Sequence, residues 1–226
     1  MKKITTIILI TLLTLIPFTT YAKSQPLYSQ NTINYFCEIA LGSEYNSGDK
    51  VINKWEQDIK IKVFGNPTVE DMETLHKVID ELNNLIGDKI NISIVEDESY
   101  NVDIHFDRIV NFSQILPTYK KNNWGYFETY SSWRGIFSAT ILESTDMPTQ
   151  TARNHLLFEE IMQILGLMND TNDTTKMDSI FQQRWTITQN YSELDKKIIQ
   201  MLYLDEIQNG MTEDGVRDVF KELSKQ

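Results

Sequence analysis

The sequence has one cysteine, Cys37, so no disulfide bond can form within the chain, even in an oxidising compartment. Basic residues are also scarce: 21 Lys and Arg against 32 Asp and Glu give a formal net charge of −11. An acidic chain of this kind is a poor candidate for binding nucleic acid or an anionic membrane. We therefore expect no nucleic-acid partner, and we expect Cys37 to be a buried thiol beside Tyr35 and Phe36.

Long apolar runs are scarce as well. The run at residues 7–18 is too short for a comfortable membrane span, which takes ~20 residues. Two lysines precede this run, and Thr20-Tyr21-Ala22 follows it with small residues at the two positions that a signal peptidase recognises. This pattern predicts a secretory signal peptide, residues 1–22, and a protein that is periplasmic or secreted, with no stable membrane insertion after cleavage. The alternative is an uncleaved N-terminal anchor.

The rest of the chain divides into segments with strand or helix periodicity. Residues 23–50 are polar and predict a loose lead-in, while residues 51–226 predict a single domain. Alternating or β-branched runs predict strands, and apolar stripes with hydroxyl caps predict helices. The expected strands are residues 58–65, 90–95, 102–106 and 135–143, and the expected helices are residues 68–86, 151–165, 192–204 and 212–223. This order favours an α+β fold over a regularly alternating parallel sheet.

The helix expected at residues 151–165 carries polar residues in an otherwise apolar segment. Glu159 and Gln163 lie four residues apart, so their side chains share one face of the helix, with Cβ atoms ~6 Å apart. Glu160 lies beside them. A metalloprotease helix uses this spacing, with zinc ligands at the first and fifth positions and an adjacent glutamate that activates the bound water. Gly166 is placed to end the helix in a sharp turn.

This segment resembles the zincin motif His-Glu-x-x-His-x-x-Gly, with Glu159 and Gln163 at the two histidine positions. The resemblance implies that Glu160 matches the general-base glutamate. Asn169 falls where metzincins place a third metal ligand, and Asp170 follows it. The resemblance therefore implies a catalytic role for Glu160, if the site is active, and binding roles for the four oxygen donors around it.

A closer resemblance extends over nearly the whole chain after the signal peptide. Its features are Trp55, the strand at residues 59–65, the Glu-Glu-x-x-Gln-x-x-Gly-Leu-x-x-Asp run, Asp178-Ser179-Ile180-Phe181, Leu202-Tyr203 and Gly210-Met211. On these features the chain resembles the bacterial family catalogued as domain of unknown function 2927, whose members are mostly exported proteins. The resemblance implies that the histidine-free helix is the family pattern, and it supplies no activity.

Together the two resemblances imply a zincin-like α+β fold. Such a fold has a small mixed sheet, a long backing helix, a central active-site helix and a helical C-terminal tail. The strand at residues 135–143 is then expected to be the edge strand that lines the substrate cleft.

Zinc is not expected to bind strongly, because it prefers imidazole and thiolate, and amide oxygens are poor zinc ligands. A hard cation such as calcium would tolerate Glu159, Gln163, Asn169 and Asp170, which all present oxygen atoms. His155 lies four residues before Glu159 and is a further weak candidate for a metal ligand in a shifted register. A simple pairing of His155 with Glu159 is the favoured alternative.

Three functions remain open at this stage. In the first, the former cleft of a catalytically degenerate metallopeptidase-like domain binds peptide or protein. In the second, Glu160 is the general base of an active hydrolase with an oxygen-rich metal site or no metal. The third is a structural envelope component, in which the polar residues of the helix only bond neighbouring loops. The aromatic residues between positions 124 and 137 either pack into the core, which we favour, or line a peptide or glycan groove.

Overall fold

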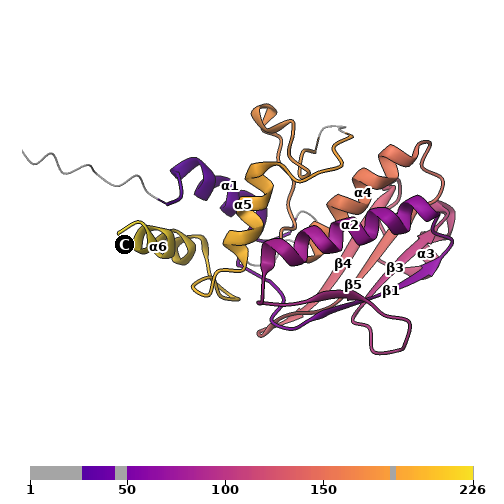
Figure 1. Cartoon of the computed structure of the whole chain (residues 1–226), viewed down its shortest axis with the longest axis horizontal. Helices are drawn as coiled ribbons and strands as arrows, with labels where there is room; N and C mark the ends of the chain where they lie inside the picture. The colour runs from indigo at the N-terminus through magenta and orange to yellow at the C-terminus, as the bar shows by residue number, and fades with distance from the viewer. Residues whose placement is uncertain (1–26, 44–49, 184–186, 226) are drawn as a thin grey trace, which may run out of the picture.

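The computed structural model describes residues 27–43, 50–183 and 187–225 (Figure 1). The predicted signal peptide lies outside these residues. The described helices and strands are α1 (Gln30–Ala40), β1 (Ile59–Gly65), α2 (Val69–Ile86), β2 (Ile92–Ile94), β3 (Val102–Asp107), α3 (Phe112–Ile115), β4 (Gly125–Ser132), β5 (Gly135–Ser144), α4 (Gln150–Ile164), α5 (Glu193–Leu202) and α6 (Glu213–Leu223). The predicted α+β fold, with a small mixed sheet, a long backing helix and a helical C-terminal tail, is confirmed.

The five strands form one sheet in the order β2-β1-β3-β5-β4. β1 pairs in parallel with β2 and β3, and β3 pairs in parallel with β5. β4 runs antiparallel to β5 and forms the edge of the sheet. The prediction that residues 135–143 form the edge strand is therefore wrong, because β5 lies inside the sheet, between β3 and β4.

The two longest helices, α2 and α4, lie across the same face of the sheet (Figure 1). α2 begins with a capping box: Thr68 Oγ1 accepts from the backbone N of Asp71 at 3.1 Å, and Asp71 Oδ2 accepts from the backbone N of Thr68 at 2.7 Å. This start confirms the cap predicted at Thr68. Alternate residues of the central strands, such as Ile104 and Ile141, are fully buried against these helices.

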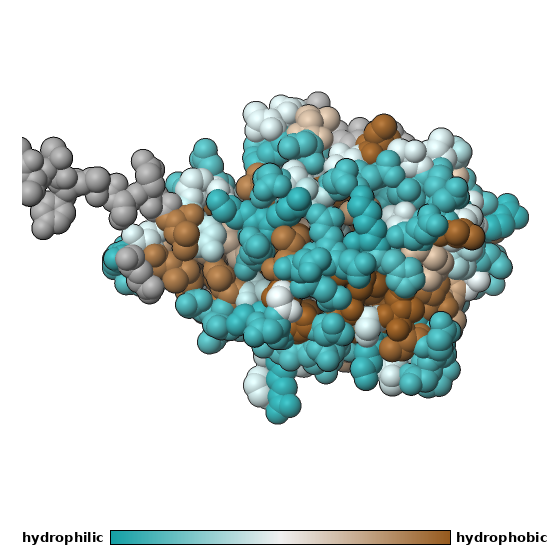
Figure 2. All heavy atoms as spheres, viewed as in Figure 1, coloured by the Kyte–Doolittle hydropathy of each residue, from teal (hydrophilic) through white to brown (hydrophobic). Residues whose placement is uncertain are grey.

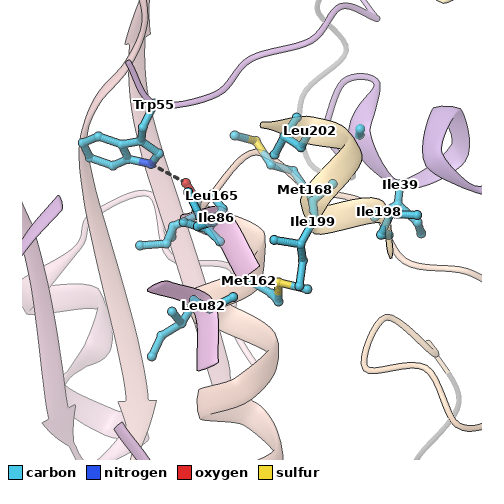
Figure 3. Packing of buried hydrophobic residues seen from close by; sticks show 14 of the residues in the cluster. Ile39, Trp55, Leu82, Ile86, Met162, Leu165, Met168, Ile198, Ile199 and Leu202 are labelled. Carbon is cyan, nitrogen blue, oxygen red and sulfur yellow. Dashed lines mark hydrogen bonds between the residues drawn. The ribbon is translucent and has the colours of Figure 1, made fainter. Parts of the chain in front are cut away.

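Residues 30–40 correct the expectation of a loose lead-in, because they form the helix α1. Ser29 caps this helix, and Phe36 and Ile39 are completely buried. Ile39 packs near Ile198 and Ile199 of α5, as Figure 3 shows, and this cluster continues to Met162 of α4. A strongly amphipathic helix was missed here because its polar neighbours dominate the composition of the segment.

No helix in the described parts of the chain is long and apolar enough to cross a membrane. Hydrophilic side chains cover most of the face seen in Figure 2, with hydrophobic side chains gathered in smaller patches between them. The buried hydrophobic residues form one large cluster and a small second one, which contains Phe112, Leu116, Tyr126 and Leu142.

Candidate functional site

The predicted helix with the Glu-Glu-x-x-Gln pattern is α4, and tertiary contacts hold its C-terminal end. The indole Nε1 of Trp55 donates to the backbone carbonyl of Ile164 at 2.7 Å (Figure 3). Gly166 follows with φ +115°, and a Cβ on this residue would clash with the carbonyl oxygen of Asn53. Both the backbone angle and the close approach require glycine, so the sharp turn expected after the helix is present.

His155 lies beside Glu159, four residues along the same helix. Its Nδ1 is 2.7 Å from the Thr188 carbonyl oxygen, to which a protonated Nδ1 donates, and its Nε2 is 3.6 Å from Glu159 Oε2. Burial lowers the pKa of His155, and the hydrogen bond to Thr188 opposes that shift. The imidazole thus favours the neutral form and connects α4 to the following loop.

Glu160 points to a different neighbour from Glu159. Its side chain is buried, and its carboxylate packs against the backbone of Gly125 at the start of β4. A Cβ at position 125 would overlap Glu160 Oε1, so glycine provides the space that this carboxylate occupies. The two adjacent glutamates of the motif have different neighbours: Glu159 lies beside His155 and near Glu143 of β5, whereas Glu160 lies against the first residue of β4.

Gln163 contacts Asp170 after the turn, whereas Asn169 bonds a different part of the chain. Gln163 Nε2 donates to Asp170 Oδ1 at 3.0 Å, which ties the last turn of α4 to the chain that follows it. Asn169 Nδ2 donates to the carbonyl oxygens of Ile39 at 3.3 Å and Leu41 at 3.1 Å. Asn169 thus satisfies carbonyls at the C-terminal end of α1, which is a structural contact.

These contacts bear on the metals considered from the sequence. Among the described residues, no group of three or more His, Cys, Asp or Glu side chains has an arrangement that could hold a metal ion. His155 presents one imidazole nitrogen near one carboxylate, and the side-chain nitrogens of Gln163 and Asn169 donate to two different parts of the chain. This donor set does not fit zinc, which needs several nitrogen, sulfur or carboxylate ligands at one point.

Glu143, on β5, is a buried carboxylate that the sequence analysis did not single out. It is 1% exposed, and its Oε1 has no hydrogen-bond partner among the described residues. Burial raises its pKa well above the usual value; the nearby Asp71 and Glu159 add to the rise, and Arg153 opposes it. The sequence feature that could have identified it is its position two residues after Ile141, because residues two apart share one face of a strand and Ile141 faces inward.

Ser179, from the Ser-Ile-Phe part of the family pattern, belongs to a buried hydrogen-bond network. Its Oγ donates to Asp195 Oδ1 at 2.7 Å and lies 2.6 Å from the hydroxyl oxygen of Tyr35. Asp195 Oδ2 also accepts from the backbone N of Ile180 at 3.1 Å and caps α5 through Ser192. The network joins α1, the loop before α5 and α5 itself, so this part of the pattern is structural.

A groove of about 770 Å³ runs along β4. None of the polar motif residues of α4 lines it. Its walls come from β4, from the turn after α4 and from the segments that precede β1, β4 and α6. Its lining residues include Thr118, Lys120, Tyr126, Phe127, Glu128, Thr129, Ser131, Ser132, Trp133, Met168, Asn53 and Asn209. Most of the aromatic residues between positions 124 and 137 thus lie on or beside the edge strand β4. Tyr126 and Phe127 are buried in it, whereas Trp133, just after the strand, is 83% exposed.

The backbone of β4 presents hydrogen-bonding groups to this edge. Thr129 lies opposite Ala139, whose backbone N donates to the Asn101 carbonyl at 3.0 Å, on the side away from β4. Opposed residues of an antiparallel ladder exchange either both bonds or none, in alternation. Thr129 and Phe127 therefore direct their N–H and C=O groups outward, where no strand of the described chain pairs with them.

Comparison with known proteins identified one matching sequence family and several solved structures that are similar at low sequence identity. The model of the family described as "Protein of unknown function (DUF2927)" matches residues 29–222, which confirms the resemblance seen in the sequence. Two solved structures of myroilysin are similar at 13% sequence identity. The first, with a TM-score of 0.46, covers 74% of this chain and 92% of its own, and the second, with a TM-score of 0.42, covers 68% and 83%. No curated protein sequence matches the chain.

Proposed function

The chain belongs to the DUF2927 family, and we propose that it binds an extended polypeptide along the outer edge of β4. This proposal is based on the edge strand β4. Its outer side pairs with no strand of the described chain and forms one wall of a groove of about 770 Å³. An added strand would satisfy the outward N–H and C=O groups of Phe127 and Thr129. Main-chain bonds of this kind give affinity, and pockets for alternate side chains give specificity.

The groove has the dimensions and lining that such a ligand needs. Small-molecule and peptide sites bury most of their ligand in volumes of roughly 300–1,000 Å³, lined by apolar groups and a few polar ones. Tyr126, Phe127 and Met168 supply apolar surface, and Thr129 and Ser131 supply hydroxyl groups. An exposed edge strand is otherwise a liability for aggregation, and β4 is eight residues long with no described strand on its outer side.

Peptide hydrolysis by zinc is not part of the proposal, because the donors on α4 do not fit that metal. The zincin-like motif is then a scaffold in which α4 supports the groove from behind. Export, predicted from residues 1–22, remains a prediction, and it would place the peptide ligand in the cell envelope or outside the cell.

The proposal is tested with short random-sequence peptides, acetylated at the N-terminus, added to the ¹⁵N-labelled protein. We expect saturable chemical-shift changes at the backbone amides of Phe127 and Thr129. Thr129→Pro should abolish these changes, because proline removes an outward N–H without breaking a bond to β5. Thr129→Ala keeps that N–H and is the matched control. Equal binding by the two variants, or no response of β4 in the unmodified protein, would contradict the proposal.

One observation favours a second function, hydrolysis with Glu160 as general base. The Glu160 carboxylate lies against Gly125, one residue before Tyr126, which lines the groove. The carboxylate thus lies next to the strand that would bind the peptide, which is where a general base would act. Glu160→Gln should then remove cleavage of the same peptides while leaving their binding to β4 intact. If mass spectrometry detects no cleavage by the unmodified protein, this second function is rejected.

A further inference from the structure

A second hollow, of about 580 Å³, lies at the hairpin end of β4 and contains a buried lysine. Lys54 is only 6% exposed, although Lys is rarely buried unless it is paired. Its backbone is held in place, since its N donates to Asn209 Oδ1 at 2.6 Å and its carbonyl accepts from Ile136 N at 3.1 Å. The side chain is therefore directed into this region by the fold itself.

The ammonium group of Lys54 makes only weak contacts with the groups around it. Its Nζ donates to the Leu204 carbonyl at a long 3.5 Å and lies 5.5 Å from the centre of the Tyr203 ring. No described carboxylate forms an ion pair with it. Asp205 is bound to Lys89 at 2.6 Å, and Glu56 accepts from Asn209 at 3.2 Å. A buried cation without a paired anion costs free energy, which an incoming anion would recover.

The charged residues that line the hollow, with Lys54 included, leave an excess of one positive charge. Lys89 and Arg134 also line it, against the two acids Glu56 and Asp205. Arg134 stacks on the exposed ring of Trp133, with its guanidinium carbon 4.8 Å from the ring centre. In a chain of net charge −11, this local excess is suited to an anionic group. Burial lowers the pKa of Lys54, whereas Glu56 and Asp205 partly oppose that shift, and a bound anion would oppose it further.

The hollow adjoins the β4 groove, since Trp133 and Asn209 line both. A polypeptide that lies along β4 and extends past Ser132 would reach Trp133 and then the Lys54 hollow. An N-terminal ammonium would be repelled there, and a terminal carboxylate would be attracted. A strand whose C-terminus lies at this end runs parallel to β4.

We propose that the hollow receives the C-terminal carboxylate of the polypeptide bound along β4, with Lys54 as its ion-pair partner. This inference rests on the proposed function and adds a substrate class: extended peptides with a free C-terminus, oriented parallel to β4. The carboxylate replaces a poorly compensated contact of Lys54 with a charge-assisted hydrogen bond.

The test compares two mixtures of N-acetylated random-sequence peptides that differ only in the C-terminus, a free acid or an amide. The ¹⁵N-labelled full chain is titrated with each mixture, and shifts of the Thr129 amide report occupancy of the groove. We expect the free acids to bind about tenfold more tightly, as one charge-assisted hydrogen bond implies. In Lys54→Met, which keeps a similar apolar stem, the two mixtures should bind equally. Lys60→Met, at an exposed position on β1, is the control and should retain the preference.

Sodium acetate tests the carboxylate site at Lys54 directly, in the unmodified protein and without a peptide bound in the groove. Acetate, but not chloride, should shift the side-chain resonances of Lys54 in the unmodified protein. If both peptide mixtures shift β4 equally and acetate leaves Lys54 unchanged, the inference is overturned while the proposed function stands. If neither mixture affects β4, the proposed function fails, and the carboxylate-terminated peptide is rejected with it.

Discussion

The carboxylate of Glu160 occupies space against Gly125 that the Cβ of any other residue would fill. This contact joins the motif helix α4 to the first residue of the edge strand β4. Gly125→Ala should therefore displace Glu160 and destabilise the fold by about 1–3 kcal/mol, the usual cost of overpacking a buried site. Urea unfolding followed by circular dichroism measures this change.

A double-mutant cycle separates this clash from a general effect of alanine in the strand. Glu160→Ala removes the overlapping carboxylate, so Gly125→Ala should cost much less in that background. Additive changes in the two variants would show that the contact with Glu160 is not the cause.

Glu143→Gln should stabilise the protein at neutral pH. The folded-state pKa of Glu143 is raised, so its contribution to stability is greatest below the unfolded-state pKa and falls as the pH rises toward the folded-state pKa. Each pH unit between these two values costs about 1.4 kcal/mol. The gain from glutamine should therefore be larger near pH ~7 than near pH ~4, with the slope taken from urea unfolding at several pH values.

The control for this prediction is Glu73→Gln, at an exposed position on α2. It should change stability by no more than about 0.5 kcal/mol across the same pH range. A destabilised Glu143→Gln at neutral pH would mean that the buried carboxylate is ionised and held by the neighbouring Arg153.

Ser179→Ala should destabilise the fold by about 1–3 kcal/mol, because it leaves the buried Tyr35 hydroxyl and Asp195 without their shared partner. Peptide binding along β4 should not change. Ser99→Ala, at an exposed loop position, is the comparison and should have little effect. Thermal unfolding and the peptide titration together distinguish this structural role from a nucleophilic one, which would abolish any cleavage while sparing stability.

Chelation of divalent cations should leave the unfolding temperature unchanged. Gln163, Asn169 and His155 bond three different partners: Asp170, the end of α1 and Thr188. Among the described residues, no group of three or more His, Cys, Asp or Glu side chains could hold a metal ion. Differential scanning calorimetry with and without EDTA provides the measurement. A lowered midpoint that zinc or calcium restores would identify a metal site and reverse this conclusion.

Local patterns were sufficient for most of the helices and strands. The capping box of Thr68 and Asp71, the apolar stripe that follows it and the glycine after α4 act over a few residues, so the sequence displays them directly. β4 was not predicted as a strand, because its aromatic residues face both a small second cluster and the solvent. The helix α1 was missed because the polar residues around it dominate the composition of residues 23–50.

The motif on α4 was visible in the sequence, but the distribution of its side chains was not. Spacing places Glu159 and Gln163 on one face of a helix, and it does not specify what lies opposite that face. The partners are residues such as Gly125 for Glu160 and Thr188 for His155, which come from other segments of the chain.

The sequence by itself determined the family, most of the helices and strands, and the absence of histidines from the metal-ligand positions of the motif. Only the tertiary structure decided which strand lies at the edge of the sheet and which charges are buried. Lys54 bonds Asn209 across 155 positions of the chain, and Trp55 bonds Ile164 across 109. Burial and edge position depend on such distant contacts, so the groove along β4 and the lysine at its end emerge only when the chain is folded.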